Sequence, residues 1–273
     1  MIGEAHIEFF GTRDKIADAK MEITHGLKED GTFIYNGDEP LLQERAANVD
    51  QYKVTFGRQL TNDLYATSVN QHETSIDFKV NEWPEEEFTI PMVGEYNVNN
   101  ALAAIAVGKQ LHITPAHMKK ALKNVELTEN RAEWIEGAQG EHILSDVYNS
   151  NPTAAKQVLK TIEELPTDGK RIAVLGDMLE LGDASARLHA SLAATIDADK
   201  IEEVYLVGSE MKNLQEALEE KGYPASAIHQ YSADELDKVT ADLQATVNAD
   251  DLVLLKASHG IHLEKVLAKL TAK

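Results

Sequence analysis

The sequence contains no cysteine among its 273 residues. This absence excludes disulfide bonds, thiolate nucleophiles and zinc sites built on cysteine, and it suits a cytoplasmic protein. Basic residues are scarce, because 26 Lys and Arg stand against 46 Asp and Glu and give a formal net charge of −20. Such a chain repels the phosphates of nucleic acids and of anionic membranes, so we expect neither as a partner. Any anionic ligand must then be held by a few local positive groups.

Long hydrophobic runs are also lacking. The longest, residues 101–107, is far too short to cross a bilayer, and the N-terminus lacks the basic and apolar regions of a signal peptide. We therefore expect a cytoplasmic protein without membrane insertion. A monomer is expected as well. The apolar share of 43% is sufficient for hydrophobic cores, and the length allows two domains.

The first half of the chain mixes helix and strand signals. Residues 1–30 have helical spacing that ends at a glycine, and residues 31–93 contain short strand-like runs separated by Asn, Asp and Gly. The alternation within residues 75–80 predicts a half-buried antiparallel strand. Residues 97–110 predict a buried, alanine-rich helix, and residues 114–125 a second helix that opens with a Thr-Pro pair.

After residue 128 short apolar strands alternate regularly with amphipathic helices. This pattern predicts parallel strands joined by right-handed crossovers, and hence a doubly wound sheet with helices on both faces. Ligands of such sheets bind at the carboxyl ends of the strands. A short connection at residues 126–132 is expected to join the two halves. The predicted strands are 143–146, 171–175, 203–207, 227–230 and 252–256, and the predicted helices begin near Pro152, Ala184, Glu210, Ala233 and Gly260.

Several well-known motifs are absent from the sequence. The phosphate-binding loop G-x-x-x-x-G-K-[ST] and the dinucleotide fingerprint G-x-G-x-x-G are both missing. The hydrolase motif G-x-S-x-G and the zinc-protease motif H-E-x-x-H are missing too. What remains is polar residues grouped at the ends of predicted elements.

Three of these groups follow predicted strands of the second half. Residues 146–152 form a polar loop and a helix that starts with proline, which is typical of a site for an anion or a ribose. A capped turn explains Asn151 and the proline that follows it equally well. The loops that contain Asp177 and Lys256 follow two other strands, so the topology places them at the same edge of the sheet.

The remaining candidates each allow a structural and a functional interpretation. Asn97 and Asn100 lie one turn apart at a helix start, where asparagine either caps the helix or contacts a purine edge. His6 and Lys20 suit a metal ligand and a modified lysine, although such residues are more often a loop histidine and a solvated lysine. His259 and His262 could share a ligand. Three other histidines are expected at the surface, namely His112, His117 and His189.

In this order, these groups resemble the Mur ligases of peptidoglycan synthesis. Within that family, the phrases Tyr-Asn-x-Asn-Pro and Gly-Asp-Met-x-Glu-Leu-Gly favour the members that add D-alanyl-D-alanine. The last loop departs from the family, because His259 stands where relatives tend to have arginine. The phrases that carry the resemblance are residues 2–6, 10–12, 19–22, 97–104, 146–152 and 175–182.

The resemblance implies an α/β chain made of two parts. Residues 1–127 would be part of the central ATPase domain, and residues 128–273 would be the doubly wound, Rossmann-like C-terminal domain. The family's N-terminal domain and phosphate-binding loop are expected to be missing, so the chain is expected to be inactive alone. Two alternatives stay open: a non-catalytic nucleotide-binding fragment, and another superfamily ligase such as a folylpolyglutamate synthase.

The resemblance also implies ATP and Mg²⁺ as cofactors, with UDP-N-acetylmuramoyl tripeptide and D-alanyl-D-alanine as substrates. An acyl phosphate on the tripeptide carboxylate would be attacked by the amine of the dipeptide. His6 and a carbamate on Lys20 would hold magnesium, and Arg131 would approach the ATP phosphates. Asn97 and Asn100 would contact adenine, and Asp146 the ribose. The implied substrate-binding residues are Tyr148, Asn149, Asn151, Asp177, Lys256 and Ser258.

Overall fold

The computed structural model describes residues 2–126 and 132–272 of the chain. The chain divides into two compact units: unit 1 comprises Met1–Ile2 and Phe10–Glu126, and unit 2 comprises Gly3–Phe9 and Leu127–Lys273. The predicted domain boundary between residues 127 and 128, and most of the predicted connection at 126–132, fall outside the described residues. Both therefore stay predictions.

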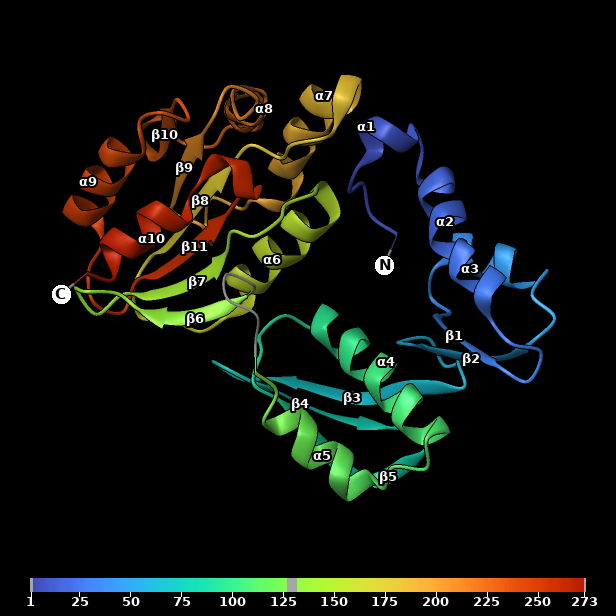
Figure 1. The fold of residues 1–273 in the computed structure, drawn as a ribbon. Coiled ribbons are helices and arrows are strands. Elements are labelled where there is room, and N and C mark those ends of the chain that lie inside the picture. Colours follow the sequence, from blue (N-terminus) through green and yellow to red (C-terminus); the bar gives the residue numbers. More distant parts are fainter. Residues whose placement is uncertain (1, 127–131, 273) are drawn as a thin grey trace. The chain divides into compact units, whose positions relative to one another are not determined.

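Unit 1 is built on a five-stranded sheet in the order β1-β2-β3-β4-β5, shown in blue and cyan in Figure 1. The pairs β1–β2 and β2–β3 are parallel, and the pairs that β4 makes with β3 and β5 are antiparallel. The strands are β1 (Thr32–Asn36), β2 (Tyr52–Gly57), β3 (Leu64–Gln71), β4 (Ile76–Val80) and β5 (Trp83–Ile90). The helices of this unit are α2 (Arg13–Met21), η1 (Glu22–Gly26), α3 (Pro40–Ala46), α4 (Tyr96–Gln110) and α5 (Pro115–Lys123).

Most of the expected elements of unit 1 are confirmed. In β4 the buried residues Ile76, Phe78 and Val80 alternate with half-buried ones, as predicted for an antiparallel strand with one face on the core. Helix α5 begins as expected, because the side chain of Thr114 accepts a hydrogen bond from the backbone N–H of His117. Helix α3 and strand β5 were not predicted from the sequence. Strand β5 contains a proline and three glutamates, which is tolerated because it lies at the edge of the sheet.

Unit 2 is a doubly wound α/β unit, as predicted. Its six strands lie in the order β10-β9-β8-β11-β7-β6, and all pair in parallel except β6 with β7. The strands are β6 (Glu133–Glu136), β7 (His142–Asp146), β8 (Arg171–Gly176), β9 (Glu203–Val207), β10 (Ile228–Tyr231) and β11 (Leu252–Lys256). The α-helices are α1 (Ile7–Phe10), whose last residue is counted with unit 1, α6 (Pro152–Glu164), α7 (Ser185–Ala190), α8 (Lys212–Lys221), α9 (Leu236–Thr246) and α10 (Glu264–Leu270). Short 3₁₀ turns are η2 (Gly182–Ala184), η3 (Ser191–Thr195), η4 (Ala225–Ala227) and η5 (His259–Ile261).

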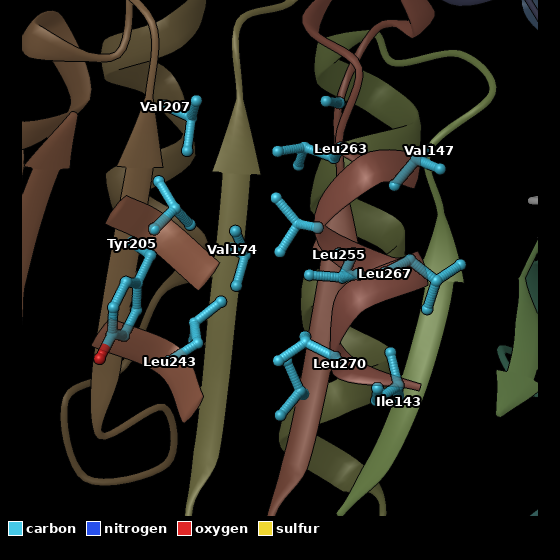
Figure 2. Packing of buried hydrophobic residues seen from close by; sticks show 14 of the residues in the cluster. Ile143, Val147, Val174, Tyr205, Val207, Leu243, Leu255, Leu263, Leu267 and Leu270 are labelled. Atoms are coloured by element: carbon cyan, nitrogen blue, oxygen red, sulfur yellow. The ribbon is translucent and has the colours of Figure 1, made fainter. Parts of the chain in front are cut away.

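The core of unit 2 explains why its central strands β8, β9 and β11 are mostly apolar. Helices α9 and α10 cover one face of the sheet, whereas α6 packs on β8 and β11 from the other face. Figure 2 shows Val174, Tyr205 and Leu255 from the strands on the same side as Leu243, Leu267 and Leu270 from the two helices. A strand buried on both faces has no polar side to present, so its sequence reads as a continuous apolar run.

Local differences from the expected elements have simple causes. The short antiparallel strand β6 was missed, because four residues with the sequence Glu-Trp-Ile-Glu carry little strand signal of their own. Helix α10 begins after the turn η5 rather than at Gly260. Over residues 2–126 and 132–272, no helix is both long enough and apolar enough to cross a membrane.

Candidate functional site

Lys256 and Asp146 bond to each other at the carboxyl edge of the unit 2 sheet. They are register partners at the ends of β11 and β7, and Lys256 is only 2% exposed. Its Nζ lies 2.9 Å from Oδ2 of Asp146 and also donates to the backbone carbonyls of Asp146 and Asn149. The buried ammonium therefore ties the end of β11 to the loop that follows β7.

Asp177 and Ser258 also connect neighbouring loops at this edge. Asp177 follows β8, is 6% exposed and accepts a hydrogen bond at Oδ1 from the backbone N–H of Met211 at 3.0 Å. Ser258 donates its backbone N–H to the Asp177 carbonyl at 3.2 Å, and its Oγ accepts from the backbone N–H of Leu179 at 2.9 Å. A Cβ at Gly208 would lie 2.3 Å from the Asp177 carboxylate, so the chain needs glycine there. Asp177 and Ser258, both predicted site residues, thus hold neighbouring loops together at this edge of the sheet.

The carboxyl group of Asp177 is electrostatically unusual. Burial raises its pKa above the ordinary value, and the backbone N–H groups of Glu210 and Met211 offset part of this rise. A carboxyl group with a higher pKa in the folded state binds its proton more tightly when folded. Its contribution to stability is therefore present below the unfolded pKa of about 3.9 and is lost as the pH rises through the raised folded pKa.

We expect Asp177→Asn to remove this pH dependence. Relative to wild type, the variant should gain stability progressively as the pH is raised from 4 to 7, because it has no carboxylate to desolvate. The measurement is urea unfolding of both proteins over this range. The exposed Asp168→Asn change is a matched control for the loss of one negative charge. A constant difference between Asp177→Asn and wild type across the range would contradict the prediction.

The first turn of α6 is occupied by the chain's own side chains. Asn151 caps the helix, because its Oδ1 accepts from the backbone N–H of Ala154 at 3.0 Å. The Glu4 carboxylate accepts from the backbone N–H of Thr153 at 3.1 Å and from its hydroxyl at 2.8 Å. The helix start that was expected to hold an anion or a ribose therefore already holds a carboxylate, which an incoming anion would have to displace.

Aromatic and imidazole side chains lie exposed near the same edge. Tyr148 is 49% exposed, and its ring centroid is 6.2 Å from that of His259. The rings of His259 and His262 are 5.9 Å apart, and Nδ1 of His262 is 3.0 Å from a carboxylate oxygen of Glu264. The side chain of Asn149 is exposed as well. Among the described residues, no three His, Asp or Glu side chains are placed to share a metal ion.

His6 is exposed, and its Nδ1 bonds to the carboxylate of Glu180 in the loop after β8. The backbone N–H of Glu8 also donates to the Glu180 carbonyl at 3.0 Å. Both His6 and Glu180 have positive φ, +61° and +62°, a region that costs non-glycine residues about 1–3 kcal/mol. Metal-bound histidines typically donate their second ring N–H to a carboxylate, so His6 with Glu180 suits a ligand that binds through Nε2.

Lys20 and the paired asparagines belong to unit 1. Lys20 is exposed in the last turn of α2. Asn97 is 3% exposed, its amide donates to the Val93 carbonyl at 2.8 Å, and its Oδ1 accepts from Asn100 at 3.0 Å. The capping interpretation was wrong, because the residue at the cap position is Glu95 and Asn97 lies inside the helix. The side chain of Asn100 is exposed. Arg131 lies outside the described residues.

The expected surface position of His189 was wrong. This side chain is completely buried. Its Nε2 accepts a hydrogen bond from the backbone N–H of Met178 at 2.9 Å, and its Nδ1 lies 2.8 Å from the Ser185 carbonyl oxygen. The structure buries it because α7 packs this side of the helix against the loop after β8. His112 and His117 are exposed, as predicted.

Three further residues escaped the sequence analysis, namely Glu4, Glu180 and Gly208. Glu180 lies within the Gly-Asp-Met-x-Glu-Leu-Gly phrase and Glu4 lies two residues before His6, so their neighbourhoods were recognised but their contacts were not. Gly208 carried no signal, because its role depends on the approach of a carboxylate from another loop.

Two protein-family models match consecutive parts of this chain. The family model for the Mur ligase middle domain matches residues 1–108, and the model described as Mur ligase, glutamate ligase domain, matches residues 130–259. The chain belongs to the Mur ligase family. The two Mur ligase matches lie in the order expected from the resemblance, and together they account for most of the chain.

Two curated relatives of this chain carry the name UDP-N-acetylmuramoyl-tripeptide–D-alanyl-D-alanine ligase. The Bacillus subtilis protein of that name is 39% identical over 269 residues, which cover 98% of this chain and 57% of the relative. The Escherichia coli protein is 28% identical, with 98% of this chain and 58% of the relative covered. The chain thus spans somewhat more than half the length of these relatives.

Solved Mur ligase structures match the fold as well. MurF from Acinetobacter baumannii superposes with a TM-score of 0.86 at 27% identity, covering all of this chain and 58% of that one. MurF from Thermotoga maritima, solved in complex with ADP, gives a TM-score of 0.82 at 26% identity and covers 99% of this chain and 60% of that one. A folylpolyglutamate synthase from Mycobacterium tuberculosis is more distant at 15% identity with a TM-score of 0.67, and it shares the fold alone.

Proposed function

We propose that this chain forms the central and C-terminal parts of an ATP-dependent ligase that joins D-alanyl-D-alanine to UDP-N-acetylmuramoyl tripeptide. The observation that carries this proposal is the 39% identity to the Bacillus subtilis ligase of that name, which extends over 98% of the chain. We assign residues 1–127 to the central domain and residues 128–273 to the C-terminal domain. Use of ATP suits a cytoplasmic reaction, and the ADP complex of the Thermotoga maritima relative supports nucleotide binding.

The proposed reaction has two chemical steps. The terminal carboxylate of the tripeptide attacks the γ-phosphorus of ATP, the bond between this phosphorus and the bridging oxygen breaks, ADP leaves, and the carboxylate becomes an acyl phosphate. The amine of D-alanyl-D-alanine then attacks this carbonyl carbon, and phosphate leaves as the amide forms. Phosphoryl transfer of this kind depends mainly on positioning and on neutralising charge. A bound Mg²⁺ would supply much of that neutralisation, which a chain with a net charge of −20 otherwise lacks.

Individual residues take proposed roles in these steps. His6 would hold Mg²⁺ through Nε2, with its ring oriented by Glu180, and a carbamate on Lys20 would hold a second ion. Lys20 is exposed on α2, and CO₂ converts its neutral amine into an anion that can bind a metal. Asn100 and Asn97 would contact adenine, Asp146 the ribose, and Arg131 the phosphates. The proposed dipeptide and peptide contacts are Tyr148, Asn149, Asn151, Asp177, Lys256 and Ser258.

Phosphate release tests the proposal. We would fuse this chain behind the part of the Bacillus subtilis ligase that it does not cover, and would assay the fusion and the chain alone with ATP, Mg²⁺ and UDP-N-acetylmuramoyl tripeptide. The expected result is phosphate release by the fusion that requires D-alanyl-D-alanine. Calorimetric binding of ADP without such release would favour a nucleotide-binding fragment instead. Release that depends on folate and glutamate would identify a folylpolyglutamate synthase.

A further inference from the structure

His189 is a buried histidine that the proposed reaction does not use. It lies in α7, eleven residues after the loop residue that it contacts, and its side chain has no solvent exposure. Its Nε2 is 2.9 Å from the backbone nitrogen of Met178, and its Nδ1 is 2.8 Å from the backbone carbonyl of Ser185. An imidazole in this position links a helix to the loop that leaves β8.

The two contacts determine the chemical state of the ring. A backbone N–H can only donate, so Nε2 must accept and carry no proton. Nδ1 must then carry the proton, because it faces a carbonyl oxygen. His189 is therefore a neutral imidazole with its proton on Nδ1. Ser185 reinforces this arrangement, since its hydroxyl lies 3.2 Å from Nδ1 and donates to a Glu210 carboxylate oxygen at 2.6 Å.

The loop that His189 contacts contains several residues that bond to other residues of the candidate site. We define this loop as residues 177–182. Its Leu179 N–H bonds to Ser258, and its Asp177 carbonyl accepts from the Ser258 N–H, so it is tied to the loop after β11. Its Glu180 bonds to Nδ1 of His6 and, through its carbonyl, to the backbone of Glu8.

We propose that His189 is a positioning residue of the ligase, which fixes loop 177–182 so that Glu180 orients the imidazole of His6. The expected effect on kcat rests on the proposed function, whereas the positioning of the loop and of the His6 ring can be tested without it. The buried N–H of Met178 has His189 as its acceptor, so losing the imidazole leaves that group unsatisfied and releases the start of the loop. Glu180 lies two residues further along, so we expect its carboxylate to lose its fixed position when Met178 is released.

The first test reads the loop and the His6 ring without any turnover. In the 273-residue chain at pH 8, nitrogen-15 chemical shifts report which nitrogen of His6 carries the proton. Wild type should show the proton on Nδ1, bonded to Glu180. His189→Leu should lose this preference and should speed hydrogen exchange at the Met178 amide at least about tenfold. His189→Gln keeps an acceptor oxygen and should restore part of both readouts.

The second test measures kinetics in the active fusion. We expect His189→Leu to lower kcat by about 10- to 100-fold, as is typical when support of a metal-binding residue is lost, with little change in KM for D-alanyl-D-alanine. The matched control is His229→Leu, which removes an imidazole that stacks on Tyr205 at 4.4 Å in the same unit. The control should lower the melting temperature. It should leave kcat within twofold of wild type, and it should leave the proton of His6 on Nδ1.

The outcomes separate the two proposals. In one outcome, His189→Leu lowers the melting temperature, but the proton of His6 stays on Nδ1 and both the Met178 exchange rate and kcat stay within twofold of wild type. His189 is then merely structural, and the inference is overturned. If the wild-type fusion releases no phosphate, the proposed function fails. The tautomer of His6 and the exchange at Met178 then still decide whether His189 positions the loop.

Discussion

Replacing Lys256 by methionine should lower the free energy of unfolding of unit 2 by about 3–5 kcal/mol, the usual range when one partner of a buried ion pair is removed. Lys256 is 2% exposed, and the Asp146 side chain that it pairs with is 19% exposed. The variant leaves this carboxylate without its counter-charge and removes the donor that Lys256 supplies to the carbonyls of Asp146 and Asn149. Methionine keeps the length of the side chain, so lost packing contributes little.

Urea unfolding measures this effect if unit 2 is observed separately. The two tryptophans divide between the units, with Trp83 in unit 1 and Trp134 in β6 of unit 2. A Trp83→Phe background therefore lets fluorescence follow unit 2. The matched control is Lys170→Met, which breaks the half-exposed pair with Glu203 at 2.7 Å and should cost less than about 1 kcal/mol. Equal losses for the two variants would show that Lys256 is not a buried anchor.

Replacing Lys20 by arginine should reduce the turnover of the active fusion by about 100- to 1000-fold, the range found when one preorganised group that stabilises a transition state, such as an oxyanion-hole donor, is removed. Arginine keeps the positive charge, but its guanidinium does not lose a proton in proteins and so cannot react with CO₂. The variant would therefore place a cation where the proposed mechanism needs a carbamate. Because Lys20 is exposed, the substitution should leave the melting temperature unchanged.

Lys15→Arg is the matched control, since Lys15 is also exposed and lies in the same helix. It should keep turnover within twofold of wild type. Phosphate release is measured with both substrates present and with added bicarbonate. If Lys20→Arg were as active as Lys15→Arg, the carbamate would play no part in the reaction and Lys20 would be an ordinary surface lysine.

The sequence was most informative where burial is uniform along an element. The central strands β8, β9 and β11 of unit 2 are buried on both faces, so each appears as a short apolar run. All five parallel strands were predicted to within two residues. Strand β5 escaped because its sequence carries conflicting local signals, and helix α3 is only seven residues long. Strand β5 combines Trp, Phe and Ile with a proline and three glutamates, and only its pairing with β4 makes it a strand.

The candidate site was predicted at the level of loops rather than of contacts. Topology alone places the ends of β7, β8 and β11 at one edge, where Asp146 and Lys256 end their strands and Asp177 follows β8. The direct pairing of Lys256 with Asp146 depends on the register of two strands that are more than 100 residues apart in sequence. No local pattern encodes such a register.

By itself, the sequence determined the family, the α/β alternation and the segments that face the carboxyl edge, because these depend on local periodicity and on short phrases. Only the tertiary structure decided which polar groups bond to each other. It buried His189, paired Lys256 with Asp146, and filled the start of α6 with Glu4. A buried donor or acceptor must find a partner, and that partner is set by packing between distant segments rather than by neighbours in the chain.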